Sequence, residues 1–260
     1  MTPNDNTFWK MQPAKMILAS DDVHIWVATF SQLRTSTSQL RNLLSDDEID
    51  RAKKIYTTKE MQRFIVARGI LRIILGRYLN MQPKMVQFRY NTYGKPALTA
   101  GNLHFSLSRS DDIVICAITR GRKIGVDAEY ICPYPEIAQV IERFFSSPEK
   151  DTVCAAIAPE KLKAFYTFWT LKEAYIKANG KGLMTPLEEV DSTFLSGESP
   201  VSYSAPGELQ KKKQWMNFNL MPAPNYIASL VVEGDDLYIS CREISRREID
   251  IFLSCTKGWQ

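Results

Sequence analysis

The hydrophobic residues of this chain change their period near residue 80, and that change limits the folds open to it. Between Lys59 and Leu79 the apolar side chains recur every three or four residues, which predicts an amphipathic helix. From residue 86 onward they alternate with polar side chains, as in Val86–Tyr90 and Leu103–Leu107, which predicts strands. The chain must therefore build both helices and sheets.

Helical and strand segments come in separate blocks along the chain. We expect further helices at 45–56, 135–145 and 162–178, and one that begins at 147. We expect further strands at 24–29, 113–118, 124–128, 214–220, 226–232 and 237–242. Because strands follow strands instead of alternating with helices, this order favours an α+β fold with antiparallel sheets over a doubly wound fold.

Short motifs predict where several helices begin and end. Ser45-Asp46-Asp47-Glu48 has the pattern of a capping box, with serine at the N-cap and glutamate at N3. Ser147-Pro148-Glu149 predicts the N-cap and the first two residues of another helix. Asn179-Gly180 fits a left-handed stop at the end of the 162–178 helix.

The composition is that of an ordinary globular chain with a slight excess of positive charge. Hydrophobic residues make up 45% and charged residues 24% of the 260 residues, which excludes a disordered chain, a collagen and a coiled coil. The net charge of +4 suits a phosphate-binding surface but does not by itself indicate nucleic acid. Four arginines of the 59–79 helix are expected on a solvated face: Arg63, Arg68, Arg72 and Arg77.

The cysteines and histidines predict neither a zinc site nor an exported protein. The five cysteines form no CxxC pair and there are only two histidines, so a zinc site would need scattered ligands. Cysteines in apolar runs, such as Cys116, fit the reduced thiols of a cytoplasmic protein, and Met1–Asp5 lacks the pattern of an export signal. The longest charge-free stretch, Gln214–Val232, is interrupted by asparagines and prolines, so no membrane span is expected.

Two acids spaced two residues apart are the first sign of a chemical site. In Gly125-Val126-Asp127-Ala128-Glu129 the alternation puts Asp127 and Glu129 on one side of a strand, where both can converge on one cation. Oxygen ligands of this kind suit Mg²⁺ together with substrate phosphates. On its own, however, such a pair is more often part of a solvated strand face.

A second pattern lies on the 162–178 helix. Glu173 and Lys177 are four residues apart and therefore share one face of that helix. The functional interpretation makes Glu173 a metal ligand and Lys177 a phosphate contact. In isolation, the more usual interpretation is a surface ion pair between successive helical turns.

Four fragments follow one another in a fixed order: Tyr93-Gly94-Lys95-Pro96, Phe105–Ser110, Gly125–Glu129, and Trp169–Lys177 followed by Gly180-Lys181-Gly182-Leu183. In this order they resemble a known enzyme family, the 4′-phosphopantetheinyl transferases of the surfactin-synthetase-activating (Sfp) type. The resemblance covers roughly residues 45–187. The order of the four fragments makes the joint signal specific.

The resemblance implies a fold of two similar α+β lobes in one chain. The lobes would be related by a pseudo-two-fold axis, and each would be a small antiparallel sheet packed with helices. We expect the N-terminal lobe at residues 1–121 and the C-terminal lobe at 122–260, with coenzyme A in the cleft between them. A chain of this type is expected to work as a monomer, with neither nucleic acid nor a membrane as its partner.

The implied reaction is the Mg²⁺-dependent transfer of the 4′-phosphopantetheine group of coenzyme A to a serine of an apo acyl or peptidyl carrier protein. The products are the holo carrier protein and adenosine 3′,5′-bisphosphate. Because the nucleophilic serine belongs to the carrier, no catalytic serine is expected in this chain.

The matching motifs also imply which residues act. By position, Asp127, Glu129 and Glu173 would hold the Mg²⁺. Lys177 would neutralise or protonate the leaving phosphate, so Lys177, Glu173 and Glu149 are the predicted catalytic residues. Glu149 matches a glutamate proposed to deprotonate the carrier serine, directly or through water. Its alternative is an acid that complements a helix N-terminus.

The coenzyme A contacts are carried over from the family in the same way. They are Arg51, Arg63, Lys95, Ser108, Arg109 and Lys177, with Arg51 matched only across a gap. Arg109 stands where the family usually has histidine, and arginine can still bind a phosphate through two nitrogens. Ser106 replaces a common asparagine, which we expect to loosen its loop.

Two other functions fit parts of the pattern. A phosphodiesterase or nuclease would use the same carboxylates with water as the nucleophile. A non-catalytic anion- or nucleic-acid-binding module would use basic residues such as Arg63, Arg68, Arg72 and Lys211. Neither function explains why Gly180–Leu183 follows the helix.

Overall fold

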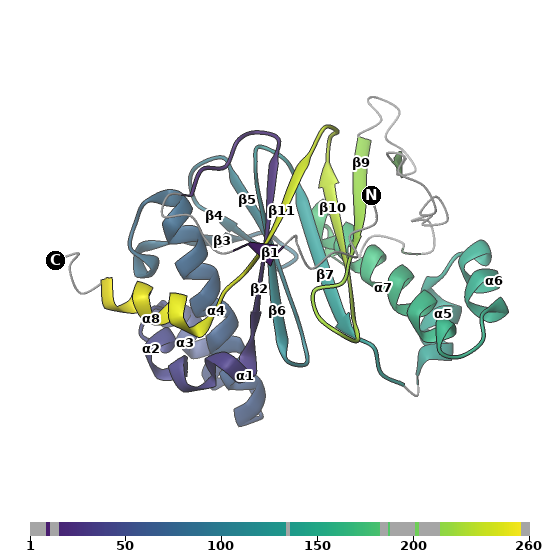
Figure 1. The fold of residues 1–260 in the computed structure, drawn as a ribbon, viewed down its shortest axis with the longest axis horizontal. Helices are drawn as coiled ribbons and strands as arrows, with labels where there is room; N and C mark the ends of the chain where they lie inside the picture. Colours follow the sequence, from purple (N-terminus) through teal and green to yellow (C-terminus); the bar gives the residue numbers. More distant parts are fainter. Residues whose placement is uncertain are drawn as a thin grey trace.

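Two β-sheets stand face to face at the centre of the molecule, and helices cover the outer face of each (Figure 1). This computed structural model describes residues 9–10, 16–133, 136–182, 187, 201–202 and 214–255. The layers are therefore helix, sheet, sheet and helix, which confirms the predicted α+β class. Leu183, Lys211, residue 135 and the segment Met1–Asp5 lie outside the described residues.

The predicted helices and strands are present, and the structure has further short elements that the sequence did not predict. The helices are α1 (Phe30–Leu33), α2 (Thr37–Arg41), α3 (Asp46–Lys53), α4 (Thr58–Leu79), α5 (Ile137–Phe144), α6 (Ser147–Ala155), α7 (Glu160–Asn179) and α8 (Arg246–Cys255). The strands are β1 (Trp9–Lys10), β2 (Asp22–Thr29), β3 (Phe88–Tyr90), β4 (Pro96–Leu98), β5 (Leu103–Ser110), β6 (Ile113–Arg120), β7 (Ile124–Tyr130), β8 (Val201–Ser202), β9 (Gln214–Leu220), β10 (Tyr226–Glu233) and β11 (Tyr238–Glu243). Over these ranges, no helix is both long enough and apolar enough to cross a membrane.

The first sheet mixes antiparallel and parallel pairs in the order β1-β11-β2-β6-β5. Strands β2, β6 and β5 are antiparallel, as predicted. However, β11 runs parallel to β2, and β1 runs parallel to β11, so the prediction of purely antiparallel sheets is wrong at this edge. The reason is topological: β11 follows β10 along the chain but joins the first sheet instead of pairing beside β10.

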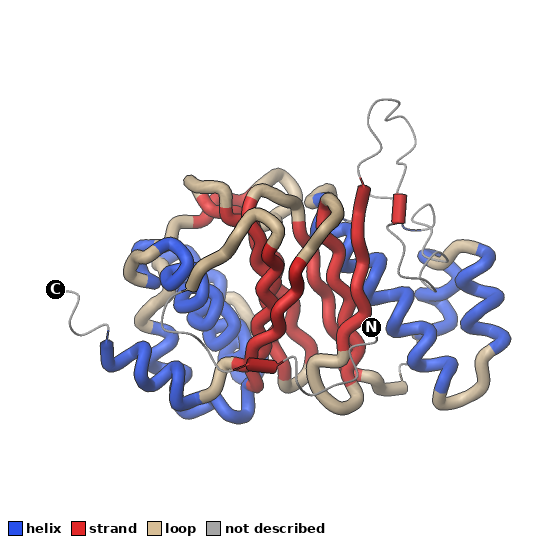
Figure 2. The backbone as a smooth tube through the Cα atoms, turned by 45° about the horizontal axis from the view of Figure 1, so that its top comes forward, coloured by secondary structure: helices blue, strands red, loops and turns tan. Residues whose placement is uncertain are grey.

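The second sheet has the order β7-β10-β9-β8 and is antiparallel throughout. Its inner face packs against the inner face of the first sheet. Val23, Ile25 and Ile115 of the first sheet share this core with Val126 and Leu230 of the second. Figure 2 shows the strands gathered in the middle, with helices at both ends of the molecule.

The last segment of the chain returns to the first sheet. Ile244 and Ile249, at and near the start of α8, share a core with Ile74 of α4 and Trp26 of β2. In the described residues, β2 near the start of the chain and α8 near its end therefore contribute to the same hydrophobic core. The predicted division between residues 121 and 122 stays a prediction.

The two longest helices end where the sequence provides a left-handed residue. At the start of α4, the Thr57 hydroxyl accepts a hydrogen bond from the Glu60 amide at 3.2 Å. This helix stops at Asn80, whose φ is 52°. Helix α7 stops at Gly180, whose φ is 77°, which confirms the predicted stop.

Two predicted helix boundaries are wrong by a few residues. Ser146, one residue before Ser147, is the N-cap of α6, and its amide donates to Glu149 at 2.7 Å. Helix α3 ends at Lys53, earlier than the predicted residue 56. The helices α1, α2 and α8 were not predicted. For α1 and α2, four or five residues are too few to establish a helical period.

The prediction that the arginines of α4 face solvent is wrong for Arg68 and Arg72. Their exposed fractions are only 7% and 1%, and both guanidinium groups meet the buried carboxylate of Glu48. The Nε atoms of Arg68 and Arg72 lie 3.2 Å and 2.6 Å from the two Glu48 oxygens. Helix α3, which carries Glu48, covers this side of α4, so Arg68 and Arg72 are buried together with the apolar stripe.

A glycine sets the distance between α7 and β7, the two elements that carry the predicted acids. A Cβ atom on Gly125 would lie 1.9 Å from the carbonyl oxygen of Ala174 and 2.5 Å from the amide nitrogen of Ala178. No real contact is that short, so the backbones of helix and strand touch directly at this point. The residue type at position 125 therefore decides whether α7 can approach β7.

Gly125→Ala should consequently destabilise the protein by about 3 kcal/mol or more, because backbone atoms cannot move aside as a flexible side chain can. Gly101→Ala is the matched control, since it places a methyl group in open space at a φ of +89° and should cost only about 1 kcal/mol. Denaturant unfolding measures both losses. Equal stability losses in the two variants would contradict the close contact.

Candidate active site

A row of serines on β5 joins the first sheet to β7 of the second. Ser106, Ser108 and Ser110 alternate along β5 and therefore lie on the same face. The Ser106 hydroxyl accepts a hydrogen bond from the Val126 amide, and the Ser110 hydroxyl accepts one from the Tyr130 amide, each at 3.0 Å. Side-chain oxygens thus take the place that a neighbouring strand's carbonyls would occupy.

The serine row corrects one prediction and adds a residue. Ser106 was expected to loosen a loop, but it is buried within β5 and fixes the backbone of β7. Ser110 was not predicted as part of the site. The period-2 spacing of the three serines is the sequence signal that could have identified it.

Asp127 lies at the centre of the site, where β5, β7 and α7 meet. It is 4% exposed, and its Oδ1 accepts hydrogen bonds from the Ser108 hydroxyl at 2.7 Å and from Lys177 Nζ at 2.6 Å. Lys177 also donates to the Ser108 hydroxyl at 3.0 Å. The other carboxylate oxygen, Oδ2, is buried and has no hydrogen-bond partner among the described residues.

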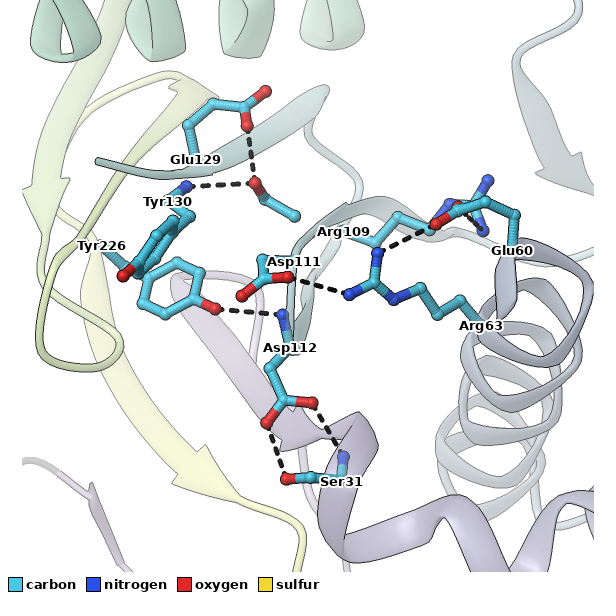
Figure 3. Close-up of polar contacts among 10 residues, drawn as sticks. Ser31, Glu60, Arg63, Arg109, Asp111, Asp112, Glu129, Tyr130 and Tyr226 are labelled. Carbon is cyan, nitrogen blue, oxygen red and sulfur yellow. Dashed lines mark hydrogen bonds and ion pairs between the residues drawn. The ribbon is translucent and has the colours of Figure 1, made fainter. Parts of the chain in front are cut away.

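Glu129 lies two residues further along β7 on the same side. Its Oε2 accepts a hydrogen bond from the Ser110 hydroxyl at 2.6 Å (Figure 3). Burial, followed by repulsion from Asp127, raises the pKa of Glu129 to about 7. Burial and Asp127 likewise raise the pKa of Glu173 on α7, while Lys177 lowers it. Asp127 is therefore close enough to Glu129 and Glu173 to disfavour the ionisation of both glutamates.

Asp127, Glu129 and Glu173 are near one another, but their carboxylates do not surround a single point as metal ligands do. In the described part of the chain, no three Asp, Glu, His or Cys side chains are grouped closely enough to hold a metal ion. Asp127 is engaged by Lys177, and Glu129 by Ser110. The predicted arrangement of three acids around one ion is not assembled in this structure.

Lys95 lies beside the C-terminal end of α7. Its Nζ is 3.4 Å from the carbonyl oxygens of Ile124 and Ala178, and burial together with Lys123 lowers its pKa to about 8. The turn that carries it is fixed by Asn91, whose side-chain oxygen accepts from the Lys95 amide at 2.9 Å. The structure therefore brings Lys95 to the helix that carries Lys177.

Two further predicted phosphate contacts, Arg63 and Arg109, lie together near the β5–β6 turn (Figure 3). Arg63 donates to Glu60 and to Asp111, both at 2.9 Å, and Arg109 lies 3.9 Å from Glu60. Each arginine thus faces a carboxylate of the protein itself. Arg51, the remaining candidate, lies over the ring of Tyr90 at 4.0 Å from its centroid.

The β5–β6 turn, which carries the Asp111 that pairs with Arg63, is fixed by contacts with two other elements. The Asp112 carboxylate accepts from the Ser31 amide at 2.8 Å and the Ser31 hydroxyl at 2.6 Å, at the start of α1. The Asp112 amide donates to the Tyr226 hydroxyl of β10 at 3.0 Å. Figure 3 shows this turn between Glu129 on one side and Arg63 on the other.

Glu149, predicted as a catalytic base, lies in a different environment from the other candidates. Its side chain is fully buried and forms an ion pair with Lys172 at 2.9 Å. It also accepts the Ser146 amide at the start of α6, which favours the alternative interpretation as a helix-capping acid.

The acids of β7, an acid and a lysine of α7, and nearby basic side chains are the kinds of group that a phosphoryl-transfer site uses. The sequence profile of the 4′-phosphopantetheinyl transferase superfamily matches residues 123–229. The 4′-phosphopantetheinyl transferase HetI of Nostoc sp. is 36% identical over 230 residues, which cover 87% of this chain and 94% of that protein. The chain therefore belongs to the 4′-phosphopantetheinyl transferase superfamily.

Other relatives agree with this assignment. The 4′-phosphopantetheinyl transferase Sfp of Bacillus subtilis is 29% identical over 166 residues, which cover 64% of this chain and 72% of that protein. The 4′-phosphopantetheinyl transferase AcpT of Salmonella typhi is 36% identical over 129 residues, which cover 49% and 65% of the two chains. The predicted enzyme class is thus confirmed.

The raised pKa of Glu129 predicts how stability changes with pH. Since its pKa of about 7 lies above the ordinary 4.5, the folded protein keeps a proton on Glu129 that the unfolded chain releases. The contribution of Glu129 to the stability of the wild type should therefore decrease as the pH rises from 4.5 to about 7. Glu129→Gln removes this loss, so its Tm in EDTA should exceed that of the wild type by a margin that grows from pH 4.5 to pH 8.

Glu142→Gln supplies the control for this titration, because the Glu142 side chain is 82% exposed. It should shift the Tm by a similar small amount at both pH values. A margin for Glu129→Gln that is the same at pH 4.5 and pH 8 would show that Glu129 titrates normally.

Proposed function

We propose that this protein transfers the 4′-phosphopantetheine group of coenzyme A to a serine hydroxyl of an apo acyl or peptidyl carrier protein. The products are the holo carrier and adenosine 3′,5′-bisphosphate. The observation that carries this proposal is the junction of three elements at Asp127, where Lys177 and Ser108 meet its carboxylate. Membership of the superfamily supplies the reaction class.

Asp127, Glu129 and Glu173 would hold Mg²⁺ at this junction, although they are not grouped around one point in this structure. The buried Oδ2 of Asp127 has no hydrogen-bond partner in the described residues, which is what a cation-binding oxygen requires. The pKa values of Glu129 and Glu173 are raised in part by Asp127, and a divalent cation would relieve that repulsion. When bound, Mg²⁺ would polarise the diphosphate of coenzyme A as a Lewis acid.

The basic side chains supply the remaining charge that the diphosphate and the 3′-phosphate need. Lys177 would neutralise or protonate the leaving phosphate, and it already lies within hydrogen-bond distance of Ser108. Lys95, Ser108, Arg63, Arg109 and Arg51 are the proposed coenzyme A contacts. A phosphate at Arg63 and Arg109 would compete with Glu60 and Asp111, which pair with them in the free protein.

A pseudo-two-fold relation between two lobes is part of the proposal. In support, α4 and α7 have 22 and 20 residues, each ends at a left-handed residue, and each covers the outer face of one sheet. The proposed lobes are residues 1–121 and 122–260, with β11 and α8 crossing back to the first. Coenzyme A would bind between the lobes, beside the serine row.

The protein would act as a monomer on coenzyme A and its carrier, without nucleic acid or a membrane. A cytoplasmic location is part of the same proposal. It is supported by four cysteines that are unpaired among the described residues, Cys116, Cys132, Cys154 and Cys241, because reducing compartments keep thiols free.

The direct test incubates the purified protein with coenzyme A, Mg²⁺ and an apo carrier protein. Mass spectrometry should show the carrier gain about 340 Da, the mass of the transferred arm. EDTA or a carrier whose acceptor serine is replaced by alanine should prevent the gain. Hydrolysis of coenzyme A without a carrier adduct would instead favour a phosphodiesterase, and salt-sensitive binding of nucleic acid without turnover would favour a binding module.

Asp127→Asn should lower the turnover number by about 100-fold or more while leaving the Tm close to that of the wild type, because the amide keeps the shape but not the charge. Glu160→Gln is the matched control, since it makes the same chemical change on α7 at a side chain that is 61% exposed. Glu160→Gln should turn over like the wild type. Similar rates for the two variants would remove Asp127 from the reaction.

A further inference from the structure

A fully buried ion pair links α6 to α7 next to the candidate site. The side chains of Glu149 and Lys172 are both 0% exposed, and Lys172 Nζ lies 2.9 Å from Glu149 Oε2. The same oxygen accepts the Ser146 amide at 2.7 Å, so one carboxylate caps α6 and pairs with α7. Both charged groups are therefore fully shielded from solvent.

The lysine of this pair is restrained from several directions. Lys172 Nζ also donates to the carbonyl oxygen of Leu187 at 2.6 Å and lies 5.9 Å from the centroid of the Phe145 ring. Phe145 in turn stacks on Phe165 of α7, with centroids 5.6 Å apart. An ammonium group held by a carboxylate, a carbonyl and a ring has one available position, so the rotation of α7 about its axis is set there.

That rotation decides where the reactive side chains of α7 lie. Glu173 follows Lys172 directly, and Lys177 lies five residues further along the same helix. Since a helix is rigid over this length, fixing Lys172 against α6 directs Glu173 and Lys177 toward β7. There, Lys177 contacts Asp127 at 2.6 Å. The ion pair and the candidate site are thus connected through one helix, α7, which contacts α6 at Lys172 and β7 at Lys177.

We propose that Glu149 is a positioning residue for the transfer reaction and not its general base. Paired with Lys172, it sets the orientation of α7 and so the placement of Glu173 and Lys177. A base must reach the proton that it accepts, whereas the Glu149 side chain is enclosed and its Oε2 already has two donors. This inference rests on the proposed function and concerns only the part that Glu149 plays in it.

The two explanations differ in what happens when the whole pair is neutralised. Glu149→Gln or Lys172→Met alone leaves one buried charge without its partner, which should lower the Tm and reduce turnover by about tenfold or more. The double variant Glu149→Gln/Lys172→Met leaves neither charge, so its Tm and turnover should recover to within about tenfold of the wild type. If Glu149 were the general base, replacing Lys172 as well could not restore the turnover that Glu149→Gln had lost.

The affinity for Mn²⁺, measured by electron paramagnetic resonance, separates the two explanations. It would not change if a variant had lost only a general base. It should weaken in each single variant, because Glu173 is displaced, and return in the double variant. A double variant that melts and binds Mn²⁺ like the wild type but turns over no faster than Glu149→Gln would overturn the proposal. If the wild type itself neither transfers the arm nor binds Mn²⁺, the proposed function fails instead.

Carboxyl footprinting of the wild type keeps the proposal testable even if every variant misfolds. Carbodiimide coupling to an amine, followed by mass spectrometry, should leave Glu149 unmodified with and without coenzyme A and Mg²⁺. Glu142, whose side chain is 82% exposed, is the internal control and should be modified readily. Modification of Glu149 at a rate like that of Glu142 would show that the carboxylate is accessible, and the positioning assignment would be wrong.

Discussion

The position of one strand, β7, controls the geometry of the whole site. On one side, the serine row of β5 holds it through hydrogen bonds to its amides and carboxylates. On the other, α7 touches its backbone because Gly125 has no side chain. Asp127 is therefore approached from the first sheet by Ser108 and from α7 by Lys177. A shift of β7 by the width of a methyl group would break the contacts of Asp127 with both Ser108 and Lys177.

The electrostatics of this junction suit a protein that binds a cation and a polyanion together. In the free protein, Lys177 balances Asp127, and Glu129 titrates near neutrality because its ionised form is repelled and poorly solvated. Arg63 is likewise paired with Glu60 and Asp111. These internal pairs compensate the charges in the free protein. Under the proposed function, ligands would replace them, so metal and coenzyme A binding should strengthen each other.

Sequence patterns predicted most elements of the fold because hydrophobic period and capping residues are local properties. They failed where a distant segment decides the outcome. Arg68 and Arg72 are buried because α3 brings Glu48 over them, and β11 is parallel because it crosses to the first sheet. In the site, the motifs identified the acids, but the burial of Glu149 depends on Lys172, 23 residues away, and no local pattern reveals such a pair.

We propose that Asp127, Glu129 and Glu173 hold a divalent ion against the diphosphate of coenzyme A. Anomalous diffraction from crystals grown with Mn²⁺ and coenzyme A tests this proposal. We expect one strong peak within coordination distance, about 2 Å, of an Asp127 oxygen and next to both glutamates and the diphosphate. Bound coenzyme A with Mn²⁺ absent from these acids, or bound elsewhere, would contradict it.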